Sequence, residues 1–183
     1  MLTKTQTVGR LPLVLGENVR MNAMMRACAA WATLEEHDKI LDMACGSGAL
    51  LAHLNERYRL TMCGMCDSPE QARQVRELLD DSDIMFGRMD DITWRNDTFD
   101  AVLLPAAMRG EVRRILDEAY RVLRAGGQMV IAASLFSMHG EGEMGKREMM
   151  RVMQEVGFKE VSYRISGFSG AIVGWKRNEL IAE

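Results

Sequence analysis

Small residues dominate a short stretch, Asp42-Met43-Ala44-Cys45-Gly46-Ser47-Gly48, that lies between two apolar segments. Small side chains let the backbone turn tightly and approach a ligand, and a helix that follows the turn presents free N–H groups to it. Two glycines can also serve backbone geometry alone, so they leave a structural and a ligand-binding role open. A nucleoside site further requires an acid about 20 residues on, which binds the ribose hydroxyls. Asp67 lies 19 residues beyond Gly48, and this spacing fits an adenosine-containing ligand.

The apolar pattern places this stretch between a strand and a helix. Residues 39–44 form an apolar run of the length of a buried strand, and residues 49–57 carry leucines at helical spacing. A second strand is predicted over residues 59–66, followed by a helix that begins near Pro69. These elements make one β-α-β unit with the glycines at its first turn.

The same patterns continue on both sides of this unit. Helices are predicted over residues 19–33, over residues 112–123 with a stop at Gly126-Gly127, and over residues 149–156 with a stop at Gly157. Further strands are predicted over residues 83–87, 99–104, 128–133, 161–165 and 171–175, the last two as an antiparallel hairpin. This alternation predicts an α/β fold with a doubly wound, mostly parallel seven-stranded sheet and a ligand crevice at the carboxyl ends of its strands.

Length and composition predict a single globular domain. The chain has 183 residues, and we expect residues 1–34 to form a segment and helix packed on a core domain of residues 35–183. A net charge of -3 disfavours a nucleic-acid partner, and no apolar run has the length that crosses a membrane. The four cysteines show no disulfide framework and the first residues no signal-peptide pattern, so we expect a cytoplasmic protein. The sequence leaves the oligomeric state open.

Cysteine and methionine each allow a second interpretation. Cys63 and Cys66 have the spacing of a redox or zinc motif, but residues three apart on a strand point to opposite faces, which favours strand packing. The 16 methionines can line an adaptable apolar pocket, although most such residues fill a core.

Residues 40–48 resemble the first motif of the class I S-adenosylmethionine-dependent methyltransferases, particularly the small type 11 group. Later segments agree with that family in order and spacing: residues 64–70, 98–102 and 120–127, and Gly157-Phe158. The resemblance covers about residues 36–176, and the combination of segments is more specific than any one of them.

The resemblance implies a cofactor, S-adenosylmethionine, and a set of residues around it. The residues implied near its methionine and ribose parts are Asp42, Ala44, Gly46 and Gly48. Cys66 or Asp67 is implied near the ribose hydroxyls. The residues implied near the adenine are Met89, Asp90 and Ile92. Leu104 and the two residues after it would form the floor near the reactive methyl group.

Two positions depart from the family pattern. Aligned on Ser68-Pro69, the ribose-binding acid of the family falls on Cys66, and the acid usual near the adenine amino group falls on Arg88. A one-residue shift at the strand end would bring Asp67 to the ribose, and we favour it because a carboxylate accepts hydrogen bonds from a diol. Arg88 accepts none, which leaves Asp90 or Asp91 for the adenine.

Methyl transfer from a sulfonium is a direct displacement, so catalysis consists largely of aligning the acceptor with the methyl group. No metal is required, and a general base is needed only where the acceptor must lose a proton; His139 is the candidate for that base. We expect a methyltransferase that acts on a small or medium organic acceptor. The alternative is a non-catalytic or weakly cofactor-binding accessory module, and an RNA or protein methyltransferase is disfavoured by the acidity of the chain.

Overall fold

The computed structural model describes residues 20–105, 108, 110–134, 145–166 and 169–177. Its helices are α1 (Ala23–Trp31), α2 (Ala49–Tyr58), α3 (Pro69–Leu78), α4 (Val112–Val122) and α5 (Lys146–Val156). Its strands are β1 (Lys39–Asp42), β2 (Thr61–Cys66), β3 (Asp83–Phe86), β4 (Phe99–Leu104), β5 (Leu123–Ser134), β6 (Lys159–Ser166) and β7 (Ser169–Trp175).

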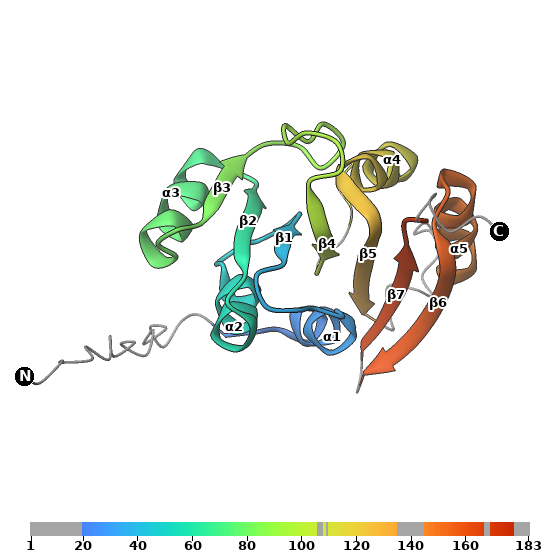
Figure 1. Ribbon diagram of the computed structural model, residues 1–183, viewed down its shortest axis with the longest axis horizontal. Helices are drawn as coiled ribbons and strands as arrows, with labels where there is room; N and C mark the ends of the chain where they lie inside the picture. Colours follow the sequence, from blue (N-terminus) through green and yellow to red (C-terminus); the bar gives the residue numbers. More distant parts are fainter. Residues whose placement is uncertain (1–19, 106–107, 109, 135–144, 167–168, 178–183) are drawn as a thin grey trace, which may run out of the picture.

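The seven strands form one sheet in the order β3-β2-β1-β4-β5-β7-β6 (Figure 1). Strands β1 to β5 pair in parallel, whereas β7 runs antiparallel to both β5 and β6. The predicted doubly wound sheet with a C-terminal antiparallel hairpin is therefore confirmed. Strand order reverses beside β1, which has β2 on one side and β4 on the other, and ligands of such sheets bind at this switch point.

Both faces of the sheet are covered, because successive side chains of each central strand enter different hydrophobic clusters. Ile40 packs with α1, α2 and α3, whereas its neighbour Leu41 packs with α4 and α5. Leu103 and Leu104 of β4 divide in the same way. Strands buried on both faces need near-continuous apolar sequences, which explains why the central strands lack a polar alternation.

The predicted stop of the fourth helix at Gly126-Gly127 is wrong, because α4 ends at Val122 and the two glycines belong to β5. The backbone turns straight from helix to strand at Leu123, whose carbonyl accepts a 2.6 Å hydrogen bond from Lys176 Nζ. A Cβ on Gly127 would lie 2.9 Å from the Arg124 carbonyl oxygen, so glycine is required here by close backbone packing.

Other element ends differ from the prediction by a few residues. β1 stops at Asp42, two residues before the predicted end, and β2 begins at Thr61, because Arg59 adopts a left-handed conformation with φ 52° that ends α2. Helix α1 is shorter than predicted and begins where the Asn22 side chain accepts a hydrogen bond from Met25 N–H. The predicted stop of α5 at Gly157, with φ 125°, is confirmed.

Helix α1 is fastened to the sheet by a buried amide. Gln128 of β5 is 2% exposed; its Oε1 accepts a 2.8 Å hydrogen bond from Thr33 N–H, and its Nε2 donates a 3.2 Å hydrogen bond to the Trp31 carbonyl. The end of α1 is thereby held over β5. Among the residues described, no helix has both the length and the apolarity to span a bilayer.

We predict that Gln128→Met lowers the free energy of unfolding by about 1–3 kcal/mol, because it leaves Thr33 N–H and the Trp31 carbonyl without their partner. Denaturant unfolding measures the loss, and hydrogen exchange should show faster opening at the end of α1. Gln74→Met makes the same change on an exposed side chain and should cost less than about 0.5 kcal/mol. Equal stability of the two variants would contradict the role given to Gln128.

Candidate functional site

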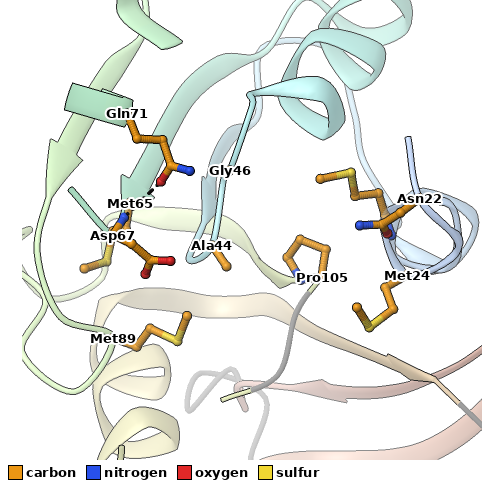
Figure 2. A pocket seen from close by; sticks show the side chains of 10 residues that line it. Asn22, Met24, Ala44, Gly46, Met65, Asp67, Gln71, Met89 and Pro105 are labelled. Carbon is orange, nitrogen blue, oxygen red and sulfur yellow. Dashed lines mark hydrogen bonds between the residues drawn. The ribbon is translucent and has the colours of Figure 1, made fainter. Parts of the chain in front are cut away.

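A pocket of about 250 Å³ lies at the carboxyl ends of β1, β2 and β4, at the switch point of the sheet. Figure 2 shows Asp67, Gln71 and Met65 on one side of it, Asn22 and Met24 on the other, and Ala44 between them. Its lining residues are Asn22, Met24, Met25, Ala44, Gly46, Met65, Asp67, Gln71, Met89 and Pro105.

The glycine turn forms the middle of the pocket, and its two glycines are there for different reasons. Gly46 has φ 52°, and a Cβ built on it would meet nothing closer than the Ala44 carbonyl oxygen at 3.8 Å. The space in front of it therefore belongs to the pocket. Gly48 has φ 78°, and its Cβ would lie 3.0 Å from Val75 Cγ1, so it permits the packing of α3 against the turn. Of the two predicted glycines, Gly46 lines the pocket and Gly48 does not.

Asp42 lies fully buried at the end of β1, directly behind the turn. Its Oδ1 accepts a 3.0 Å hydrogen bond from Ala44 N–H, whereas Oδ2 has no hydrogen-bond partner among the described residues. Burial raises the pKa of the Asp42 carboxyl from its ordinary value of 3.8 to about 7, against the opposing effect of the Ala44 N–H. Asp42 is not a lining residue of the pocket. Because a buried carboxylate is costly without a compensating charge, a positive charge in front of the turn would favour its ionised form.

The structure separates the two candidates for a ribose-binding residue. Asp67 is exposed and lines the pocket, and its N–H donates a 3.1 Å hydrogen bond to Gln71 Oε1. Cys66 is buried behind the pocket wall, with its Sγ 2.7 Å from that of Cys45. The N-cap of α3 is Ser68, whose Oγ accepts a hydrogen bond from Gln71 N–H, so Asp67 is not needed as the helix cap.

The residues predicted near the adenine lie at different depths. Met89 lines the pocket, whereas Ile92 is buried in the core beside α4. Asp90 is bound by Arg88 through two hydrogen bonds, of 2.8 Å to Oδ1 and 2.6 Å to Oδ2. This guanidinium lowers the pKa of the Asp90 carboxyl and occupies both of its oxygens. In this structure Asp90 is therefore paired with Arg88.

Of the three residues predicted to form the floor of the pocket, Leu104 is fully buried, Pro105 lines the cavity, and residue 106 lies outside the described residues. The sequence did not predict the contribution of α1 and its N-cap, namely Met24, Met25 and Asn22, or those of Met65 and Gln71. Four methionines line the pocket. Their flexible side chains make this an adaptable apolar surface, which is one of the two roles that the sequence left open for methionine. His139 lies outside the described residues.

The cysteine pair of β2 divides between the two faces of the sheet. Cys63 packs in the cluster below α4, and Cys66 in the cluster with α2 and α3. Within the described part of the chain, no three His, Cys, Asp or Glu side chains are grouped so as to hold a metal ion.

Comparison with known proteins identifies the domain. Residues 41–131, which contain the glycine turn and Asp67, match the family described as Methyltransferase domain. The chain belongs to this family. No curated protein shows a significant match to the chain in sequence.

Solved structures of methyltransferases share its fold. A methyltransferase from Thermotoga maritima is 18% identical, with a TM-score of 0.67 over 84% of this chain and 87% of that one. Geranyl diphosphate C-methyltransferase from Streptomyces coelicolor, solved with S-adenosylhomocysteine, is 13% identical, with a TM-score of 0.70 over 84% and 74%. A chain from a complex of the Haloferax volcanii Trm112 methyltransferase activator is 17% identical, with a TM-score of 0.68 over 85% and 89%.

The buried Asp42 gives a prediction about stability and pH. Between its ordinary pKa of 3.8 and about 7, the unfolded chain loses the Asp42 proton while the folded chain keeps it. This group therefore destabilises the fold as pH rises through that interval, and the effect levels off above pH 7. We predict that Asp42→Asn has nearly wild-type stability near pH 4 and gains up to a few kcal/mol over the wild type by pH 8, since one pKa unit corresponds to about 1.4 kcal/mol.

Denaturant unfolding of the ligand-free protein across this pH range measures the difference. Asp80→Asn removes an exposed carboxylate and should leave the difference from wild type nearly independent of pH. A stability difference between Asp42→Asn and wild type that does not change with pH would show that Asp42 is already ionised or already paired in the folded chain.

Proposed function

We propose that the protein is an S-adenosylmethionine-dependent methyltransferase that transfers a methyl group to a small or medium organic acceptor by direct displacement. The observation that carries the proposal is the combination, at one switch-point pocket, of an open glycine turn and an exposed carboxylate at the end of the next strand. Members of its family share this fold, and one solved neighbour contains the product form of the cofactor.

The residues present fit that cofactor. The space in front of Gly46 would accept ligand atoms that a side chain would exclude. The unpartnered Oδ2 of Asp42 lies behind the same turn, and an ammonium group of the methionine part would supply the missing charge. Asp67 offers a carboxylate to the ribose hydroxyls, and Met89 an apolar contact to the adenine.

In the proposed reaction the protein binds the cofactor and aligns the acceptor with its methyl group. When bound, S-adenosylmethionine supplies a methyl group on a positively charged sulfur, which is a good leaving group. Asp42, Gly46 and Asp67 would fix the two ends of the cofactor, while Pro105 and the methionines of α1 bound the space left for an acceptor. Asp67 is the ionisable side chain among the described lining residues, and we assign it to the ribose. His139 remains the candidate base for acceptors that must lose a proton.

One observation favours a second candidate, a weakly cofactor-binding accessory module. Arg88 stands where the family has an acid, and it binds both carboxylate oxygens of Asp90, whose side chain is only 6% exposed, so Asp90 is a weakened acceptor for the adenine amino group. One structural neighbour was solved in a complex with a methyltransferase activator, so partner binding is compatible with this fold. Transfer of labelled methyl groups to metabolites separates an enzyme from a module, and transfer to RNA or protein would overturn the proposed acceptor class.

We predict that S-adenosylhomocysteine binds the wild type with measurable heat and that Gly46→Val abolishes binding, because the new side chain fills the space in front of the turn. Isothermal calorimetry measures both. Gly126→Val is the matched control: Gly126 also has a positive φ, of 80°, and lies at the opposite end of the sheet with no atom within 4 Å of its built Cβ. Loss of binding in both variants would mean that backbone strain alone explains the result. Absence of binding by the wild type would favour the accessory module.

We also predict that Asp67→Ala weakens S-adenosylhomocysteine binding by roughly tenfold or more, because charge-assisted hydrogen bonds contribute about 1.5–3 kcal/mol. Cys66→Ala, one residue away and buried, should change the affinity little. Thermal unfolding shows whether each variant is folded. A silent Asp67→Ala beside a damaging Cys66→Ala would place the ribose at the family's aligned position and reject Asp67.

A further inference from the structure

Two buried thiols meet directly behind the cofactor pocket. The sulfur atoms of Cys45, in the glycine turn, and Cys66, at the end of β2, are 2.7 Å apart, and both residues are free thiols. They are 21 residues apart in the chain. The other two cysteines lie elsewhere: Cys28 on α1 has its sulfur 3.7 Å from the Val130 carbonyl oxygen, and Cys63 is on the opposite face of the sheet.

The backbone holds this pair in place. Cys45 N–H donates a 2.9 Å hydrogen bond to the carbonyl of Met65, the residue before Cys66. Gly64 has no side chain, and a Cβ built there would lie only 3.0 Å from Cys45 Cβ. The missing side chain therefore allows the glycine turn to lie directly against β2. Since a disulfide has its sulfur atoms about 2.05 Å apart, joining these two requires a movement of well under about 1 Å.

The two thiols also differ in reactivity. A hydrogen bond between the two thiols, in which either sulfur can be the donor, lowers the pKa of Cys66 in spite of its burial. The same hydrogen bond, together with burial, raises the pKa of Cys45. Thiolate is the reactive form, and Cys66 is 3% exposed whereas Cys45 is fully buried, so Cys66 is the sulfur that an oxidant meets first and Cys45 is the resolving thiol.

We propose that Cys45 and Cys66 form a reversible intramolecular disulfide when the protein meets a peroxide. The Cys66 thiolate attacks one oxygen of hydrogen peroxide, which breaks the O–O bond, gives a sulfenic acid on Cys66 and releases hydroxide. The Cys45 thiol then loses its proton and attacks Cys66 Sγ, and the sulfenic oxygen leaves as water. The two thiols are oxidised, the peroxide is reduced, and a dithiol reductant reverses the change. A small oxidant is required because Cys66 is only 3% exposed.

The disulfide would join the two segments that shape the pocket. Ala44 and Gly46 flank Cys45, and Met65 and Asp67 flank Cys66, and all four line the pocket. A ligand in the pocket therefore covers the approach to the sulfur pair. If the proposed cofactor site is right, on which this part rests, S-adenosylhomocysteine at ten times its Kd should slow disulfide formation about tenfold, in proportion to the unoccupied fraction.

The test uses the full-length reduced protein treated with hydrogen peroxide, then denatured in an alkylating reagent and analysed by mass spectrometry. Reduced protein should carry four alkyl groups, one on each of its four cysteines. Oxidised protein should carry two, and its digest should contain a Cys45–Cys66 cross-linked peptide that dithiothreitol removes. Cys45→Ala and Cys66→Ala should abolish the cross-link, whereas Cys63→Ala, a matched change of a buried cysteine on the same strand, should keep it.

Oxidised wild type that keeps four alkylated thiols, or that gains oxygen on Cys66 without a cross-link, overturns the proposal. A cross-link that involves Cys28 or Cys63 overturns it as well. These outcomes are read from the wild type alone and do not depend on the variants being folded. A Cys45–Cys66 disulfide whose formation S-adenosylhomocysteine does not slow supports the disulfide and contradicts the proposed cofactor position. Normal S-adenosylhomocysteine binding without any disulfide supports the proposed cofactor site and contradicts the disulfide.

Discussion

The site depends on the way the chain leaves β1. After Asp42 the strand has ended, but its hydrogen bonds continue to both neighbours: Met43 N–H donates to the Leu103 carbonyl of β4, and Cys45 N–H donates to the Met65 carbonyl of β2, each at 2.9 Å. The glycine turn is thereby held between two strands before it enters α2. A turn fixed from both sides by backbone bonds keeps its position whether or not a ligand is present, which lowers the ordering cost of binding.

This anchoring determines the direction of each side chain in the turn. The Asp42 carboxylate stays behind the turn, fully buried with one oxygen unpartnered among the described residues, and Cys45 is pressed against β2. Gly46 faces the pocket, where any side chain would occupy ligand space. The same few residues therefore hold a buried carboxyl group, a thiol contact and an opening to solvent, and each of these follows from the path of the backbone.

The sequence predicted the fold well because its signals were local and repeated. Apolar runs, helical periodicity and Gly157 identified the strands, the helices and the end of α5 to within a few residues. Gly126-Gly127 was misinterpreted because a glycine that allows close packing of distant backbone looks, in sequence, like a glycine that ends a helix. That distinction depends on residues far away in the chain: Gly126 N–H donates a hydrogen bond to the Lys176 carbonyl, and a Cβ on Gly127 would lie 3.1 Å from the Asp100 carbonyl oxygen.

The candidate site was predictable where its signals lie in local sequence motifs, and not where it depends on tertiary contacts. Gly46 and Asp67 belong to the glycine turn and its spacing, Ala44 and Met89 were implied by the family resemblance, and all four line the pocket. The contact of Cys45 with Cys66, the capture of Asp90 by Arg88 and the contribution of α1 depend on side-chain directions and tertiary packing. Every lining residue from Ala44 to Pro105 lies within the segment that matches the family, residues 41–131. Asn22, Met24 and Met25 precede that segment. The pocket thus has one wall, at the start of α1, that lies outside the family match. Under the proposed function, exchanges there would change which acceptor is admitted while the glycine turn and Asp67 stay the same.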